Sequence, residues 1–373
     1  MTQVESHIDP MFGEDDIDVA GRLLLGAPAE PHAHLDKALL ADRVENPDGD
    51  LMGAIVAMMA HRPNLTVDDI AERAERAARM MLVNGCTAIR THVDVGDDIG
   101  TMAVEALLRV RGAMADVLDL QIVALLAAPT TGLAGAGNRA AMRDAFQVGA
   151  DVVGGCPHLD PEPERCQRYF LETGGELGLP VDLHTDEHLD PAHCDLAVMA
   201  EWVTRTGFRN GVTASHCVSL GMRDGSEQER IARDVADARI AVITLPHTNL
   251  FLQGRAHSVA TPRGLTAIRP LLRAGVVLAA GADNLQDPFN TLGRADPFET
   301  AALMVMAGHL TPTEAWQSVS TASRQAMGLA PAGPAVGLVA DFVAVPAATL
   351  REAIAMGPAG RMVVRRGVVV AGG

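Results

Sequence analysis

Short apolar runs rich in β-branched residues alternate along the chain with longer segments that mix charged and apolar positions. Runs of this length and composition are typical of parallel strands that are buried on both faces. There are eight such runs. The first ends near His34, and the others cover residues 87–95, 120–127, 151–156, 179–185, 211–217, 240–246 and 274–283.

The segments between these runs have helical periodicity. Residues 67–85, VDDIAERAERAARMMLVNG, place charged side chains on one face and apolar side chains on the other, and they end in a glycine. Repeated strand–helix units predict an α/β fold, a (β/α)8 TIM barrel, although an open doubly wound sheet has the same local pattern. No GxGxxG or GxxxxGK[ST] motif follows the first strand, which disfavours the nucleotide-binding forms of the open sheet.

The tail of the chain has a different pattern. After the Pro/Gly-rich residues 330–337, two short strand-like pieces follow at 340–345 and 361–372, and they predict a small β appendage. The predicted division is an appendage made of residues 1–28 plus 330–373, and a barrel made of residues 29–329.

Composition and charge restrict the possible partners. The chain has 373 residues, of which 48% are hydrophobic and 3% aromatic, so its core is built from Ala, Val, Leu, Ile and Met. A formal net charge of −17 disfavours binding to nucleic acid or anionic membranes and favours a neutral or cationic small molecule. No uncharged apolar run approaches the ~20 residues that span a bilayer, and the amino terminus is acidic where a secretory signal is basic. We therefore expect a cytoplasmic protein.

Histidines and acidic residues gather at the carboxyl ends of the predicted strands. His32 and His34 lie at i and i+2 at the end of the first strand, so both can face one metal ion. In a barrel all strand ends meet at one rim, where barrel enzymes place their sites. Three histidines and a carboxylate with one open position form the coordination shell of a hydrolytic metal ion. The side chains at these ends are His32, His34, His184, Glu187, His216 and Asp283.

Each of these residues has a simpler interpretation when it is considered alone. A single HxH pair or a lone histidine is often an ordinary surface or core histidine, and Asp283 could merely cap the helix that follows it. The combination of several strand ends with suitable ligand types favours a catalytic metal site. Glu187 strengthens this interpretation because it lies three positions after His184, within reach of a metal-bound water.

A set of motifs covers nearly the whole predicted barrel: HAHLDK from His32, RTHVDV from Arg90, HTDEHLD from His184, SHC from Ser215, LPHTNLFLQGR from Leu245, RGLTAIRPLLRAGV from Arg263 and GADNLQDPFNTLG from Gly281. In this order they resemble the amidohydrolase superfamily and, within it, the cytosine deaminase branch. The resemblance implies that the metal ligands are His32, His34, His184 and Asp283, with Glu187 as the proton shuttle and His216 as the contact to the attacking hydroxide.

The resemblance also implies a reaction. A metal-bound hydroxide would attack an sp² carbon of a small N-heterocyclic substrate, Glu187 would deliver a proton to the adjacent nitrogen, and ammonia or an amine would leave. Hydrolysis of an N-alkyl amine or of a cyclic amide on the same scaffold is an alternative, as is a catalytically silent binding relative. The presence of every predicted ligand disfavours the silent relative. The family tendency is toward homo-oligomers.

Lys37 is the only lysine in the chain. Two-metal members of the superfamily bridge their ions with a carbamylated lysine from the fourth strand, and here that strand reads DVVGGC. We therefore predict a mononuclear centre with one divalent ion, Zn²⁺ or Fe²⁺. Lys37 is either an ordinary solvated lysine or part of the pocket lining.

The substrate pocket departs from the cytosine deaminase pattern. His158 follows Cys156 and Pro157 where cytosine enzymes carry a glutamine, Asn284 replaces an aspartate, and Phe289 replaces a tryptophan. These differences disfavour cytosine as the substrate. They favour a different cyclic amidine, an ammelide-type triazine, an iminohydantoin or a related lactam. We expect substrate contacts from His158, Asn284, Phe289 and Lys37, and support for the site from His92 and Asp94. The short segment before His32 implies that the appendage is a reduced β-sandwich.

Overall fold

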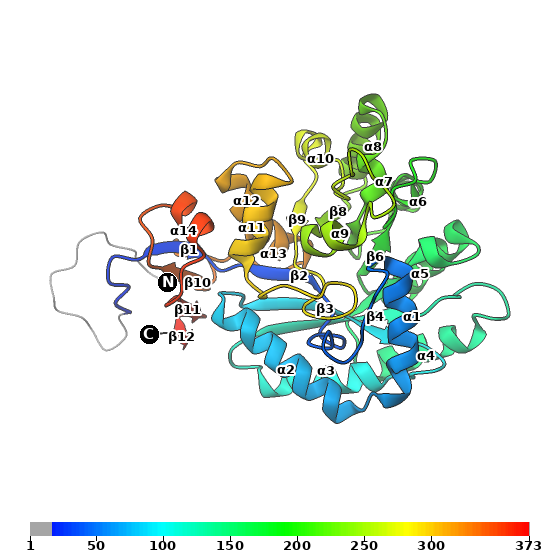
Figure 1. The fold of residues 1–373 in the computed structure, drawn as a ribbon, viewed down its shortest axis with the longest axis horizontal. Helices are drawn as coiled ribbons and strands as arrows, with labels where there is room; N and C mark the ends of the chain where they lie inside the picture. The colour runs from blue at the N-terminus through cyan, green and yellow to red at the C-terminus, as the bar shows by residue number, and fades with distance from the viewer. Residues whose placement is uncertain (1–16, 373) are drawn as a thin grey trace.

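Eight parallel strands form the centre of the molecule in the computed structural model, which describes residues 17–372 (Figure 1). Strands that follow one another in the chain are neighbours in the sheet, and a parallel bridge between Ala33 and Asp283 joins the last strand to the first. The predicted (β/α)8 TIM barrel is therefore confirmed, because an open sheet would leave these two edges apart. The strands are β2 (Ala29–Ala33), β3 (Ala88–Val95), β4 (Asp119–Leu126), β5 (Val152–Gly155), β6 (Val181–Thr185), β7 (Val212–His216), β8 (Ala241–Thr244) and β9 (Leu278–Ala280).

Helices cover the outside of the ring, as Figure 1 shows. The helix predicted at residues 67–85 is α2 (Val67–Val83), which begins where the Thr66 hydroxyl accepts a hydrogen bond from the Asp69 amide. Its buried face includes Ile70 and Met81. Among residues 17–372 no helix is both long and apolar enough to cross a membrane. The other helices are α1 (Leu51–His61), α3 (Met102–Ala113), α4 (Ala136–Val148), α5 (Pro163–Leu177), α6 (Asp195–Thr206), α7 (Val218–Gly221), α8 (Gly225–Asp237), α9 (Pro246–Leu252), α10 (Ile268–Ala274), α11 (Pro297–Met306), α12 (Pro312–Val319), α13 (Thr321–Ala326), α14 (Leu350–Met356), and the short 3₁₀ turns η1 (Arg62–Asn64) and η2 (Pro157–Leu159).

A second, antiparallel sheet combines the two ends of the chain. Its order is β1 (Leu23–Gly26), β10 (Phe342–Val345), β11 (Met362–Arg365) and β12 (Val368–Ala371). The described residues form this one sheet rather than the two facing sheets of a sandwich, and residues 1–16 of the predicted appendage lie outside the described part. One face of the sheet packs on the main core through Val343 and Val363, whereas Ile17 and Val19 pack against the opposite face.

A buried ion pair joins this sheet to the barrel. The Arg361 guanidinium donates to both carboxylate oxygens of Asp296, at 2.8 Å and 2.7 Å, directly before α11. The guanidinium carbon also lies 4.5 Å from the centre of the Phe298 ring. A bidentate pair with both partners buried fixes the position of β11 against α11.

Replacing Arg361 should destabilise the fold. Arg361→Ala leaves the Asp296 carboxylate buried without its cation, so we expect a loss of roughly 3–5 kcal/mol in the free energy of unfolding. Urea denaturation followed by circular dichroism measures the change. Arg351→Ala, at an exposed position of α14, is the matched control. Equal unfolding midpoints for the two variants would contradict this role of the ion pair.

Candidate active site

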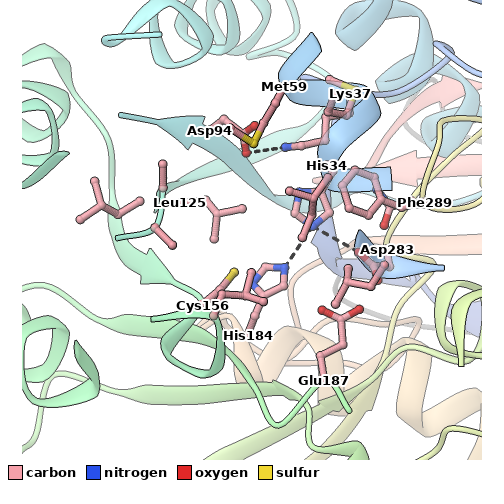
Figure 2. Close-up of a pocket in the computed structure, with 18 of the residues that line it drawn as sticks. His34, Lys37, Met59, Asp94, Leu125, Cys156, His184, Glu187, Asp283 and Phe289 are labelled. Carbon is pink, nitrogen blue, oxygen red and sulfur yellow. Dashed lines mark hydrogen bonds and ion pairs between the residues drawn. The ribbon is translucent and has the colours of Figure 1, made fainter. Parts of the chain in front are cut away.

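Four side chains bring their donor atoms together at the carboxyl end of the barrel strands, and Figure 2 shows three of them, His34, His184 and Asp283. His32 and His34 come from the end of β2, His184 from β6, and Asp283 from the loop after β9. Nε2 of His184 lies 3.2 Å from Nε2 of His32 and 3.2 Å from Nε2 of His34. Oδ1 of Asp283 lies 3.6 Å and 3.3 Å from the same two nitrogens.

The spacing and chemistry of these donors fit a divalent metal ion. Metal–nitrogen distances of about 2.0–2.1 Å in a tetrahedral site place neighbouring donor atoms about 3.3–3.4 Å apart. Both carboxylate oxygens of Asp283 are buried and have no hydrogen-bond partner within residues 17–372. Such an arrangement costs free energy unless a cation lies against the carboxylate. The residues therefore form a cluster that is able to hold a metal ion.

Burial favours the neutral form of two of the clustered histidines. It lowers the pKa of His32 and the pKa of His184 well below the ordinary histidine value, and neighbouring imidazoles shift both in the same direction. A neutral imidazole offers a nitrogen lone pair, which is the form that binds a metal ion. The lowered pKa values of these two histidines therefore favour binding of a metal ion over protonation.

Glu187 and His216 lie against the same cluster. Burial, reinforced by the negative charge of Asp283, raises the pKa of Glu187 well above its usual value. Nδ1 of His216 lies 3.0 Å from Oδ1 of Asn249 and 3.6 Å from Oε1 of Glu187. Because an amide oxygen can only accept, Nδ1 of His216 carries the proton and Nε2 keeps its lone pair. The site therefore combines a carboxyl group that favours its protonated form with a free imidazole nitrogen.

The backbone is strained at three of the strand ends that carry these side chains or adjoin them. Asp186, His216 and Asp283 have φ angles of 52°, 70° and 65°, in the left-handed region that non-glycine residues rarely adopt. Each such residue costs on the order of 1–3 kcal/mol and persists only where the surrounding structure enforces it. The strain therefore accumulates at the strand ends that carry the chemistry.

A cavity of ≈ 170 Å³ opens over the cluster. Its walls are mostly apolar, and Figure 2 shows Met59 and Leu125 on the sides away from His184 and Glu187. The cavity is lined by three of the residues predicted from the sequence to contact substrate, Asn284, Phe289 and Lys37. His158 is not among the lining residues, and its ring lies 6.1 Å from that of His188.

Helix α1 is the part of the wall that sequence reasoning missed. It contributes Leu51, Ile55, Met58 and Met59 to the cavity, and Arg62 follows directly after it. The sequence does contain a signal for this helix, the run LMGAIVAMMAH, which is apolar on every face of a helix. A helix of this kind has to bury more than one side, or to contact a ligand.

Lys37 is buried in an ion-pair network rather than solvated. Its ammonium donates to Asp94 Oδ1 at 2.7 Å and to Asp36 Oδ2 at 3.0 Å, and Arg62 donates to the other Asp94 oxygen at 3.0 Å. The positive charges of Lys37 and Arg62 outweigh the effect of burial and hold the pKa of Asp94 far below its usual range. These charges form the wall of the cavity at the end of β3, as Figure 2 shows for Asp94 and Lys37.

Comparisons with known proteins place this site in a family. The model of the amidohydrolase family matches residues 37–371. The chain belongs to the amidohydrolase family. It is therefore a hydrolase of carbon–nitrogen bonds, as the motifs predicted.

Individual relatives of this amidohydrolase carry more specific names. A pterin deaminase from Rhizobium rhizogenes is 33% identical over 348 residues, which cover 92% of this chain and 79% of the relative. The structure of a 5-methylcytosine deaminase from Klebsiella pneumoniae with 5-fluorocytosine has a TM-score of 0.90 and 29% identity, covering 99% of this chain and 91% of that one. An N-isopropylammelide isopropylaminohydrolase structure from Burkholderia multivorans has a TM-score of 0.81 and 27% identity, covering 95% and 88%.

Removing the Lys37 charge should cost far more stability than removing a surface charge. Lys37→Met leaves the Asp36 and Asp94 carboxylates short of a buried cation, so we expect the free energy of unfolding to fall by about 3 kcal/mol or more. Arg165→Met is the control, because Arg165 pairs with Glu162 on the exposed surface, where such pairs are worth about 0–1 kcal/mol. Urea unfolding of both variants measures the difference. Similar small losses would mean that Lys37 behaves as a solvated lysine.

Proposed function

We propose that this amidohydrolase removes the exocyclic amino group of a planar nitrogen heterocycle by hydrolysis. The observation that carries the proposal is Glu187, a buried carboxyl with a raised pKa that lines the cavity beside the cluster of His34, His184 and Asp283. Pterin and 5-methylcytosine, for which two of the relatives are named, are both planar heterocycles with an exocyclic amino group.

The residues available for the metal support a mononuclear centre. One divalent ion, Zn²⁺ or Fe²⁺, would be held by His32, His34, His184 and Asp283, where it would supply a Lewis acid that lowers the pKa of a water molecule. Strand β5 contains no lysine, and the ammonium of Lys37 is already paired with Asp36 and Asp94. A lysine-bridged pair of ions is therefore not part of the proposal.

The remaining chemistry belongs to residues of the chain. Asp283 accepts a proton from the attacking water, and Glu187 donates a proton to the ring nitrogen beside the attacked carbon. His216 accepts a hydrogen bond at Nε2 from the hydroxyl that adds to this carbon, because this nitrogen carries a lone pair, is unpartnered within the described residues and belongs to a ring that borders the cavity. The proton held by Asp283 then passes to the exocyclic nitrogen, the bond to this nitrogen breaks, and ammonia leaves. The proton of the added hydroxyl returns to Glu187 as the carbonyl forms.

Asn284 offers a defined contact to the substrate ring. Its amide nitrogen donates to Asp287 Oδ2 at 2.8 Å, which orients the side chain and leaves Oδ1 as an acceptor. Within the described part of the chain, Oδ1 accepts only a long 3.4 Å contact from the Thr248 hydroxyl. An acceptor at this wall suits a ring N–H or an amino group. Phe289 and Lys37, on the same cavity, would contact the ring face and a ring oxygen.

One observation favours a second candidate function. The side chains of Leu51, Ile55 and Met58 make the α1 wall apolar, and such a wall could bury an alkyl group on the departing nitrogen. Hydrolysis of an N-alkyl amine would use the same cluster and the same proton transfers, with an alkylamine as the leaving group. The name of the Burkholderia multivorans relative describes a reaction of this kind.

Turnover of a substrate panel tests the proposal. We expect ammonia release from at least one of pterin, 5-methylcytosine or an aminotriazine, and alkylamine release from an N-alkyl triazine would favour the second candidate. Glu187→Gln should lower kcat by about 10²–10⁴, because the proton donor is lost while the shape is kept. Glu201→Gln, at an exposed position on α6, is the control. A Glu187→Gln rate close to that of the wild type would refute the assigned role.

Removal of metal gives an independent check. We expect a chelator to abolish turnover, and about one equivalent of Zn²⁺ or Fe²⁺ per chain to restore it and to raise the melting temperature through linkage. Asp283→Ala should bind the ion more weakly, whereas Asp68→Ala, at a surface ion pair, should bind like the wild type. Elemental analysis measures the stoichiometry. A value near two ions per chain would contradict the mononuclear centre.

A further inference from the structure

A line of buried polar groups runs from the metal-ligand cluster into the barrel interior. Nδ1 of His32 lies 2.9 Å from the hydroxyl of Ser215, this hydroxyl donates to Asp182 Oδ1 at 3.1 Å, and Arg90 donates to Asp182 Oδ2 at 2.8 Å. The first three residues are fully buried, and Arg90 is 2% exposed. Arg90 is in turn held by Gln121 Oε1 at 2.9 Å.

The direction of each hydrogen bond follows from chemistry. Arg90 is charged at every physiological pH and pairs with Asp182, whose carboxylate can only accept. The Ser215 proton therefore goes to Asp182, and the Ser215 oxygen has to accept from Nδ1–H of His32. His32 is thereby held in the tautomer whose Nε2 carries the lone pair, and this is the atom that faces His184 and Asp283.

His32 differs in this respect from the other two histidines of the cluster. Nδ1 of His34 and Nδ1 of His184 are buried and find no hydrogen-bond partner in the described part of the chain. His32 has a second restraint as well, because its ring stacks on that of His92 with 3.8 Å between the ring centres. One contact fixes the tautomer of His32 and the other fixes its plane.

The position of this network inside the barrel argues against a role in packing alone. Barrel interiors are ordinarily filled by layers of Val, Ile and Leu side chains. Here alternate positions of β6 carry Asp182 and His184, and His184 is paired in register with Ser215 on β7. Polar and charged groups at such depth are costly unless every bond is made, so the polar interior indicates a function beyond filling space.

We propose that Ser215 and Asp182, anchored by Arg90, are positioning residues that pre-orient His32 as a metal ligand. The proposal rests on the metal site of the proposed function and adds to it the residues that prepare one ligand before the ion arrives. Partners of this kind raise the basicity of a histidine ligand and reduce the entropy that is lost when the ion binds.

The test is the affinity of Ser215 variants for Zn²⁺, measured by competition with a chromophoric chelator on the metal-free full chain. Ser215→Ala should raise the Zn²⁺ dissociation constant by about 10–100-fold, because the Nδ1 proton of His32 loses its acceptor. Ser219→Ala is the control, because Ser219 is also fully buried and its hydroxyl has no partner within residues 17–372. We expect it to bind Zn²⁺ like the wild type.

Ser215→Cys serves if the alanine variant does not fold, since a thiol fills similar space but is a much weaker acceptor. It should weaken Zn²⁺ binding in the same direction. Wild-type affinity in a folded Ser215 variant would overturn the proposal, and so would an equal loss in Ser219→Ala, which would indicate general disturbance of the barrel. Failure of the wild type to bind Zn²⁺ would instead refute the metal site itself.

Discussion

Closure of the barrel is the constraint on which the site depends. His184 lies 152 positions after His32, and Asp283 lies 99 positions after His184. Only a closed ring brings the end of β2 next to the end of β9. The bridge between Ala33 and Asp283 makes this closure, and the amide of Asp283 donates to the carbonyl of His32 at 3.0 Å. Glu30 strengthens this junction between the ends of β2 and β9, since its carboxyl accepts hydrogen bonds from the amides of His32 and Ala282. In an open sheet the ends of β2 and β9 would lie at opposite edges.

Closure also determines the electrostatics of the centre. Helices exclude water from outside the ring and side chains fill it from inside, so charged groups at the strand ends are desolvated. The same burial that lowers the pKa of His184 raises the pKa of Glu187, because in each case the uncharged form is favoured. The preference of His184 for its neutral form and of Glu187 for its protonated form thus follows from one cause.

The sequence predicted the parts of this structure that have a local signal. The buried part of β4 and the whole of β9 read as continuous apolar runs, and the cluster residue Asp283 follows three positions after the end of β9. The sequence predicted a β appendage built from both ends of the chain. It did not reveal that the strands form a single sheet, because the pairing of strands distant in the chain has no periodic signal. The same limit applies to the bonds of Ser215 and Arg90, since a lone serine or arginine within a strand does not reveal its partner.

Helix α1 shows how a missed element bears on specificity. Its sequence is apolar on all sides, yet Met52 and Val56 are 56% and 61% exposed, while Leu51, Ile55 and Met58 line the cavity. The helix therefore forms a wall between the substrate cavity and the surface, and it is tied to the charged end of β3 through Arg62 and Asp94. The cluster and Glu187 can serve loss of ammonia or of an alkylamine alike. In the proposed function, the α1 wall is therefore the part of the cavity that distinguishes these leaving groups, and its methionine side chains can repack around an alkyl group.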